Sequence, residues 1–358
     1  MNSSELVEKA AGCLAGLAVG DAMGLPTQFL TPEKIESEFG RIEDFRSPPD
    51  WHPYGDSLPG TVTDDTEQAL ALTDMILENG GELTAPDSAE ALLGWAREKD
   101  LLGTEYVGPS TGRALEKIAS GTDPRITGFG GVTNGASMRI APVGIINPLI
   151  GGESRNGLLR EVRTVCTPTH NTPIAVAGAS AVAAVIGEGM AGNTDVESIL
   201  HSGRNAGKTA YGRTEEALPD ISAVGDGVTM ELLTGRISPS LGRRVEMALE
   251  LAEKTGIEEL PGKLYDVIGA GVNTIETVPT AMALFSVSAE DPVKAVTLAA
   301  NAGGDTDTIA AIAGAMAGAY AGYSVFSSGY LERVEEVNDL NIQEYARNLV
   351  QLIDEGGN

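Results

Sequence analysis

Apolar and polar positions follow one another along this chain with the period of a helix. Between residues 5 and 20, apolar side chains such as Leu6, Ala10 and Leu17 recur at helical spacing. No run of alternating β-branched residues bounded by turn residues interrupts this pattern. The same period predicts helices that begin at Thr63 and Pro86 and others over residues 111–118, 136–142, 158–165, 174–186, 196–206, 243–253, 280–285, 292–301, 309–323 and 342–353.

This pattern predicts an all-α protein, built as a single compact multi-helix domain over residues 1–358, because no repeat or low-complexity linker divides the chain. The helices predicted over residues 174–186 and 309–323 are apolar on every face, which is typical of helices in a protein core. Both are too short and too rich in alanine and glycine to cross a bilayer. Residues 214–234 fit neither pattern clearly.

Prolines indicate where several of these helices begin or end. Thr31 and Pro32 have the character of an N-cap and a first helical position. Pro26 is expected to end the first helix, since its ring cannot continue a helix without losing a hydrogen bond. For the same reason, Pro142 is expected to stop the short helix that contains Ser137 and Met138.

Charge and cysteine content then limit the classes of partner and compartment. The formal net charge is −27, which argues against nucleic acid or an anionic membrane as a partner. The acidity fits either a high-salt cytoplasm or an ordinary acidic enzyme. The first nine residues lack a basic region followed by an apolar run, so we expect a cytoplasmic protein without a signal peptide. Cys13 and Cys166 lie in apolar, helical surroundings and are predicted to be reduced core thiols.

The strongest chemical signal is the sequence Asp305-Thr306-Asp307-Thr308, which precedes the apolar helix predicted over residues 309–323. Carboxylates at the mouth of a buried helix need a counter-charge, because burial of an unpaired charge is very costly. No lysine or arginine within this stretch supplies one. A hard divalent cation is the simplest partner for them.

A second group of the same kind is Thr63-Asp64-Asp65, which also opens a predicted helix. Each group has a simpler explanation, since acids and threonine are favoured at helix N-termini without any ligand. If the two groups converge, however, their carboxylates repel one another unless cations lie between them. Ligands that are all oxygen favour Mg²⁺, Mn²⁺ or Ca²⁺ over zinc, and a pair of ions would suit this number of carboxylates.

Five motifs in order give the chain a resemblance to the ADP-ribosylglycohydrolase family. They are residues 20–24 (GDAMG), 63–66 (TDDT), 134–142 (NGASMRIAP), 169–170 (TH) and 303–308 (GGDTDT). The resemblance implies an all-α fold with two Mg²⁺ (or Mn²⁺) ions in a central cleft. It also implies hydrolysis of a glycosidic bond at the anomeric carbon of a ribose.

The resemblance further implies roles for individual residues. The metal ligands would be Thr63, Asp64, Asp65, Asp305, Asp307 and Thr308. Asp65 and Asp305 would be the catalytic carboxylates. The substrate would be contacted by residues of the glycine-rich and helix-end segments, namely Gln28, Asn134, Gly135, Ser137, Met138, His170, Gly303 and Gly304.

Gln28 departs from the family pattern, in which a glutamate usually follows the Gly-Asp-Ala-x-Gly motif. A glutamine can orient a water or a ribose hydroxyl, but it cannot accept a proton at neutral pH. The general base would then be a carboxylate such as Asp65 or Asp305, or water bound to the ions. The departure therefore bears on the substrate more than on the metal chemistry.

Three other features are open to two interpretations each. The loop over residues 129–135 (FGGVTNG) could bind a phosphate or ribose with its backbone N–H groups, or it could be a simple connection. His170 could reach the cleft or cap a helix. His52 lies in a proline-rich loop predicted over residues 45–61 and could help form the rim of the cleft.

The resemblance thus implies a divalent-metal-dependent hydrolase of ADP-ribosylated acceptors, either proteins or small molecules, or of a related ADP-ribosyl compound. Gln28 motivates an alternative in which the substrate is a free nucleoside or another small ribosyl metabolite. A third interpretation, from another class, is a non-catalytic protein that binds ADP-ribose or has a structural role, as crystallin J1-like relatives suggest.

Overall fold

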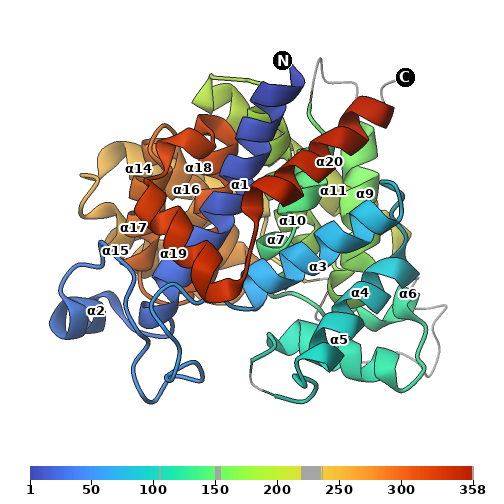
Figure 1. Cartoon of the computed structure of the whole chain (residues 1–358), viewed down its shortest axis with the longest axis horizontal. Helices are drawn as coiled ribbons and strands as arrows, with labels where there is room; N and C mark the ends of the chain where they lie inside the picture. The colour runs from blue at the N-terminus through green and yellow to red at the C-terminus, as the bar shows by residue number, and fades with distance from the viewer. Residues whose placement is uncertain (105, 150–154, 219–234, 236, 357–358) are drawn as a thin grey trace.

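The computed structural model of the chain describes residues 1–104, 106–149, 155–218, 235 and 237–356. Helices account for every regular element in this part of the chain, and its one β-bridge joins Thr133 to Asn273. The prediction of a compact, single-domain all-α fold is confirmed (Figure 1).

The helices follow the order of the sequence-based prediction with longer bounds. In the first half they are α1 (Ser3–Gly24), the 3₁₀ turn η1 (Leu25–Thr27), α2 (Pro32–Phe39), α3 (Asp64–Glu78), α4 (Ala85–Glu98), α5 (Pro109–Ala119), α6 (Pro124–Thr127), α7 (Gly135–Met138), α8 (Ala141–Ile146) and α9 (Arg155–His170). The second half contains α10 (Pro173–Met190), α11 (Val196–Ala217), α14 (Leu241–Lys254), α15 (Leu260–Val267), α16 (Thr274–Ser288), α17 (Pro292–Ala300), α18 (Thr306–Ala321), η4 (Tyr323–Val325), α19 (Ser328–Asn338) and α20 (Ile342–Gly356).

The two helices α1 and α18 form the centre of the molecule, although they come from opposite ends of the chain (Figure 1). Their backbones approach very closely. A Cβ atom added to Gly16 would lie 2.0 Å from the carbonyl oxygen of Gly314, and one added to Gly318 would lie 1.9 Å from that of Gly12. Such contact is possible only because glycine has no side chain at these positions. The apolar residues of α18 are buried, as predicted for a core helix.

Two helices in the described part of the chain are long and apolar enough to span a bilayer. They are α1 continued through η1 (Ser3–Thr27) and α10. The apolar windows of both are almost entirely covered by the rest of the protein, which is typical of core helices in a globular protein. The two thiols predicted to lie in the core, Cys13 and Cys166, are buried and free.

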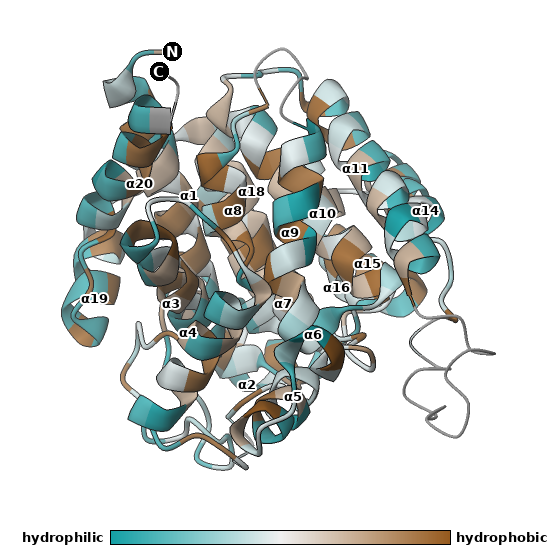
Figure 2. Cartoon of the chain, turned by 90° about the vertical axis from the view of Figure 1, so that its right-hand side faces the viewer, coloured by the Kyte–Doolittle hydropathy of each residue, from teal (hydrophilic) through white to brown (hydrophobic). Residues whose placement is uncertain are grey.

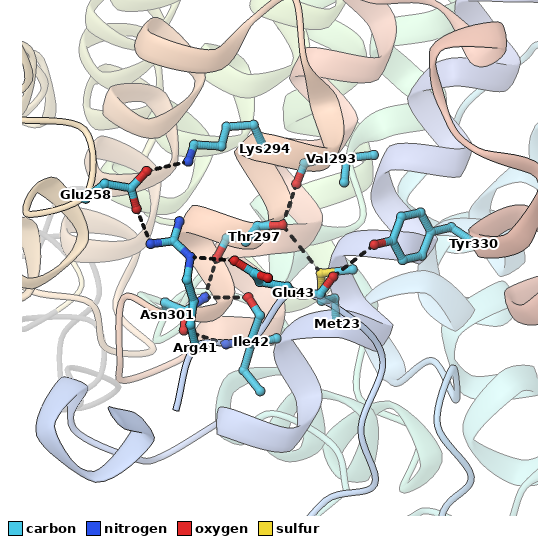
Figure 3. A network of polar contacts seen from close by, with 10 residues as sticks. All are labelled: Met23, Arg41, Ile42, Glu43, Glu258, Val293, Lys294, Thr297, Asn301 and Tyr330. Carbon is cyan, nitrogen blue, oxygen red and sulfur yellow. Dashed lines mark hydrogen bonds and ion pairs between the residues drawn. The ribbon is translucent and has the colours of Figure 1, made fainter. Parts of the chain in front are cut away.

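A network of polar contacts ties the loop after α2 to α17 and so fixes the segment that leads into α18 (Figure 3). The Asn301 side chain accepts from the Ile42 N–H at 2.9 Å and donates to the Ile42 carbonyl at 2.9 Å. Beside it, the carboxylate of Glu258 accepts from both Arg41 and Lys294. These contacts hold the chain immediately before Gly303 on two sides.

Some of the predicted helix boundaries are wrong. Pro142 does not stop a helix, because it lies in the first turn of α8, where its missing N–H has no intrahelical partner to lose. The predicted end of the first helix is confirmed, because α1 ends at Gly24 and Pro26 lies in the 3₁₀ turn η1 that follows it. The sequence pattern did not identify α15 and α19. Of the segment left unassigned, residues 214–217 belong to α11, and residues 219–234 lie outside the described part of the chain.

Candidate metal centre

The carboxylate of Asp21, near the end of α1, holds the N-terminus of α3. It accepts hydrogen bonds from the backbone N–H groups of Thr63, at 2.9 Å, and Thr66, at 3.1 Å. The hydroxyls of the same two threonines donate to it at 2.8 and 2.6 Å. An acid at a helix N-terminus is favourable because it satisfies N–H groups that have no intrahelical partner. Asp21 therefore fixes where Asp64 and Asp65 lie.

The two predicted groups of acids, at the starts of α3 and α18, are in direct contact through Asp65 and Thr308. The Thr308 hydroxyl donates to Asp65 Oδ1 at 3.2 Å, and the Thr308 N–H donates to Asp307 Oδ1 at 2.9 Å. Carboxylate oxygens of Asp21, Asp65 and Asp307 all lie within 4.8 Å of one another. The N-termini of α3 and α18 thus bring together residues that are more than 240 positions apart in the sequence.

This carboxylate cluster has the properties of a cation site. Asp21, Asp65 and Asp307 are each at least 98% buried, and Asp65 Oδ2 has no hydrogen-bond partner among the described residues. Burial raises the pKa of Asp65 and of Asp307 well above the usual range, and the neighbouring carboxylates raise both further. A buried oxygen without a donor, surrounded by other carboxylates, fits a hard divalent ion with oxygen ligands.

Asp64 and Asp305 lie beside this cluster. Asp64 is the half-buried member, and desolvation together with the charge of Asp21 raises its pKa to about 8. Asp305 is buried and accepts from the Asn134 side chain at 2.5 Å and from the Gln28 side chain at 3.2 Å. Burial raises the pKa of Asp305, and these two donors act in the opposite direction. Both amides therefore favour the charged form of Asp305.

Gln28 belongs to a hydrogen-bond chain whose direction is set by the backbone. The N–H of Tyr54 donates to His52 Nδ1 at 3.2 Å, so the ring proton of neutral His52 is on Nε2. Nε2 lies 2.9 Å from Gln28 Oε1 and donates to it. The amide nitrogen of Gln28 is therefore turned toward Asp305. His52, expected only at the rim, is 96% buried and orients Gln28.

A second chain of hydrogen bonds leads from Asp64 to His170. Gln68 donates to Asp64 at 2.9 Å and accepts from Arg139 at 2.6 Å. Arg139 also donates to Thr169, whose hydroxyl lies 2.8 Å from His170 Nδ1. Arg139 is 99% buried, and within the described residues its side chain donates to Gln68, Thr111 and Thr169 and to no carboxylate. Arg139 is therefore linked to Asp64 only through Gln68.

His170 ends α9 and is completely buried. Its Nε2 lies 3.0 Å from the Thr133 hydroxyl, within the glycine-rich loop over residues 129–135. Burial and the charge of Arg139 hold the pKa of His170 well below its usual range, so the ring is neutral at physiological pH. These contacts fix the loop, and a role in substrate binding stays a prediction.

The two glycines before Asp305 have backbone conformations that favour glycine. Gly303 and Gly304 have φ values of +80° and +77°. A Cβ on Gly304 would lie 2.1 Å from the carbonyl oxygen of Ala270. The backbone of Gly304 is held by Leu30 O and Phe29 N–H, at 2.8 and 2.6 Å. This turn directs the N-terminus of α18 toward the N-terminus of α3.

The remaining predicted substrate residues surround the second loop. Gly135 faces the His170 ring, since a Cβ there would lie 2.9 Å from His170 Cε1. Ser137 and Met138 are buried in α7, and Ser137 Oγ has no hydrogen-bond partner among the described residues. Of this set, Gln28, Asn134, Gly303 and Gly304 are directly connected to Asp305 or adjacent to it in sequence.

Reasoning from sequence included Asp21 in a motif but gave it no role. The available signal was a carboxylate near the end of an otherwise apolar helix, which has to be paired when buried. Tyr54 and Arg139 were also missed. The pKa of Tyr54 is raised by burial and by several carboxylates, Asp64 first among them, and its ring centroid lies 6.0 Å from that of His52.

Comparisons with known proteins agree with this geometry. The sequence profile of the ADP-ribosylglycohydrolase family matches residues 2–358. The chain is 32% identical to an uncharacterized protein of Escherichia coli, YegU, over 96% of this chain and 97% of that protein. It is 24% identical to the ADP-ribosyl-[dinitrogen reductase] glycohydrolase of Rhodospirillum rubrum, over 99% and 98% of the two chains. A solved structure described as an ADP-ribosylglycohydrolase-related protein complex superposes with a TM-score of 0.69 at 25% identity, covering 98% of this chain and 99% of the other.

Proposed function

Because this chain belongs to the ADP-ribosylglycohydrolase family, we propose that it is a divalent-metal-dependent hydrolase of ADP-ribosylated acceptors or of a related ADP-ribosyl compound. Members of the family are hydrolases that act on glycosyl bonds, and this chain is such a hydrolase. We further propose that the activity depends on divalent metal ions, that the bond cleaved is at the ribose anomeric carbon, and that the protein is cytoplasmic.

The observation that carries the metal dependence is the unpartnered Oδ2 atom of Asp65. It lies in a buried site where oxygens of Asp21 and Asp307 are within 4.8 Å of those of Asp65. Buried polar atoms are normally paired, and several carboxylates in one buried site repel one another. A cation removes both difficulties at once.

The ligands proposed for two Mg²⁺ or Mn²⁺ ions are those of the two helix N-termini, and Asp21 lies close enough to contribute. The set is Thr63, Asp64, Asp65, Asp305, Asp307 and Thr308. When bound, such ions act as Lewis acids that bind ribose hydroxyls and stabilise negative charge. Magnesium or manganese fits oxygen ligands better than zinc does.

Hydrolysis forms a bond between a water oxygen and the anomeric carbon and breaks the bond from that carbon to the leaving group. The water loses a proton, and the leaving group gains one. Asp65 and Asp305 are the proposed acceptors of the water proton, because burial raises the pKa of both carboxylates and so makes them stronger bases. Both carboxylates also favour the positive charge that develops on the ribose ring.

Gln28 cannot exchange a proton in this scheme, since it is an amide. Its NH₂ group donates to Asp305 Oδ1, so it holds that carboxylate in place. His52 and Asn134 complete the support, one through Gln28 and the other directly. Asp305 is thereby preorganised by neutral donors on two sides.

The presence of Gln28 favours a second candidate substrate, a free nucleoside or another small ribosyl metabolite. In the family pattern this position usually carries a glutamate, and an amide held by His52 offers the substrate different hydrogen-bonding groups. The ribose would be bound in the same way, and only the leaving group would differ. A non-catalytic role is the weakest of the three interpretations, because several relatives of this chain are named as hydrolases and every expected ligand type is present.

A test of the metal dependence compares hydrolysis of ADP-ribosyl-arginine, ADP-ribosyl-serine and free nucleosides with Mg²⁺ and with EDTA. The Asp65→Asn and Asp305→Asn variants are expected to lose more than about a hundredfold of the activity with any substrate that the wild type cleaves. The exposed Asp100 provides the matched control Asp100→Asn. Undiminished activity in EDTA or in both variants would rule out the metal assignment. Turnover confined to nucleosides would select the second candidate.

A further inference from the structure

A cavity of about 680 Å³ is lined by residues of α6, α9, α11 and the start of α4. Figure 2 shows where these helices lie in the molecule. Among the described residues, four arginines line the cavity and no aspartate or glutamate does. They are Arg125, Arg160, Arg163 and Arg213. None of the proposed metal ligands belongs to its wall, so this arginine pocket is separate from the carboxylate cluster.

The concentration of positive charge is unusual for this chain. Its formal net charge is −27, and it has 16 arginines, of which a quarter line this one cavity. Like charges that face one cavity repel one another, and the repulsion disfavours the arrangement unless anions compensate it. The acids of the chain are numerous enough to do so, yet none in the part that the structure describes lines the arginine pocket.

The arginines are only weakly engaged by other side chains. Arg125 donates to the carboxylate of exposed Asp123 at 3.4 Å, and Arg160 forms a longer ion pair with Glu161 at 3.8 Å. Arg213 donates to the Asn156 side chain at 2.9 Å. The Arg163 guanidinium has no ion pair or hydrogen bond among the described residues. Planar guanidinium groups with free donors are suited to bidentate binding of phosphate or carboxylate.

The wall of the arginine pocket also contains buried polar atoms that have no partner. Thr214 Oγ1 and Asn171 Oδ1 are buried and form no hydrogen bond within the described residues. Thr214 is fully buried and Asn171 is 95% buried. A hydroxyl can donate to an anion, and a half-turn of the Asn171 amide would present its NH₂ group instead. Thr214 and Asn171 therefore provide buried polar groups in the wall of the arginine pocket that could bind an anion together with the arginines.

The ligand that this surface suits is a small molecule with a phosphate group. The volume of the arginine pocket matches that of small-molecule sites. A nucleic-acid-binding protein would instead need a basic surface that extends over a larger area. Phe129 lines one side and offers an apolar face to a planar ring. It begins the loop whose Asn134 donates to Asp305, so the two sites share one loop.

We propose that the arginine pocket is a binding site for a phosphate-bearing small anion, distinct from the site of hydrolysis. The guanidinium groups of Arg160 and Arg163, on successive turns of α9, provide most of the binding. Arg125 and Arg213 close the site from α6 and α11. Binding there needs neither a metal ion nor turnover.

Calorimetric titration of the full chain with pyrophosphate and with AMP tests this proposal. It is done at constant ionic strength without added divalent cations, since pyrophosphate would chelate them. The Arg160→Gln, Arg163→Gln double variant is expected to bind each ligand at least about tenfold more weakly than the wild type. The exposed Arg347 on α20 provides the matched control Arg347→Gln, which should bind like the wild type.

Circular dichroism and thermal unfolding of each variant check that the fold is retained, and both replaced arginines are solvent-accessible. Absence of pyrophosphate and AMP binding to the wild type would overturn the proposal. Equal binding by the double variant would also overturn it, as would binding of a single-stranded oligonucleotide alone. Because binding is measured directly and without metal, a negative result leaves the proposed hydrolase unaffected, and an inactive hydrolase could still bind the anion.

Discussion

At the scale of single residues, Gln28 is where this chain departs from its family, and its environment explains what the amide does. The carboxylate of Asp305 accepts from Gln28 and Asn134, both of which are neutral. A glutamate at position 28 would place a second negative charge against Asp305. The chain of donors from Tyr54 through His52 is built for an amide.

Replacement of Gln28 by glutamate should therefore destabilise the metal-free protein at pH 8. We expect the free energy of unfolding to fall by about 1–3 kcal/mol, because one hydrogen bond to a buried carboxylate is replaced by repulsion. Urea unfolding in EDTA measures it. The exposed Gln343→Glu in α20 is the control and should change stability little. Equal stability of the two variants would contradict the assigned orientation of Gln28.

His52 should remain neutral across the physiological range. Desolvation lowers its pKa from 6.5 to about 4, so the folded protein keeps the ring uncharged above that pH. Nitrogen-15 NMR of the imidazole should show a proton on Nε2 and none on Nδ1 at pH 7. A ring that titrates near 6.5, or a proton on Nδ1, would contradict the hydrogen-bond chain. The exposed His201 provides an internal reference for an accessible imidazole.

At the scale of elements, three helix ends form the site. The end of α1 provides Asp21, the start of α3 provides Asp64 and Asp65, and the start of α18 follows Asp305. Helix N-termini attract negative charge, so α3 and α18 stabilise the carboxylates that they carry. The turn at Gly303 and Gly304 gives α18 its direction, because residues with a side chain rarely adopt its backbone angles.

Gly304→Ala should be among the most damaging single substitutions in the chain. Its φ of +77° disfavours any side chain, and a Cβ would lie 2.1 Å from the Ala270 carbonyl oxygen. We expect a loss of about 3 kcal/mol or more in the free energy of unfolding, or failure to fold. The control is Gly94→Ala in the exposed middle of α4, where a Cβ meets nothing within 4 Å. That change should stabilise by roughly 0.5–1 kcal/mol.

At the scale of the whole molecule, the carboxylate cluster couples stability to pH and to metal. Without ions, burial raises the pKa of Asp64 to about 8, and the pKa of Asp65 and Asp307 is raised well above 3.8. The folded state then holds protons that the unfolded chain has already released at neutral pH. Stability must therefore fall as pH rises toward 8.

Urea unfolding in EDTA should show this fall between pH 7.5 and 9, a window at least about one unit above the unfolded pKa of histidine, so that buried His170 contributes little change. The expected slope is about 1.4 kcal/mol per pH unit for each proton that the folded state retains. With saturating Mg²⁺ the slope should shrink or reverse, because the ions bind the deprotonated carboxylates. An identical slope with and without Mg²⁺ would contradict a metal site at this cluster.

The fold and half of the site could be predicted from sequence, because they depend on local properties. Helical period, caps such as Thr31 and the uniformly apolar sequence of α18 depend on neighbours within a few positions, and each was predicted. The acids of α3 and α18 were found for the same reason. Their type and their place at helix starts are visible without knowing the fold. Pro142 shows the limit of such reasoning, since a proline that can end one helix can equally begin the next.

Only the tertiary structure decided which side chains from distant parts of the chain meet. Asp21, His52 and Arg139 lie far in sequence from the groups that they hold, so no local pattern gives them these roles. The contact between α1 and α18 determines their positions, and it depends on glycines whose partners are about 300 residues away. The sequence determined which groups could bind a cation. Close packing of α1 against α18 decided that these groups converge, because burial of the two helices brings their polar ends together.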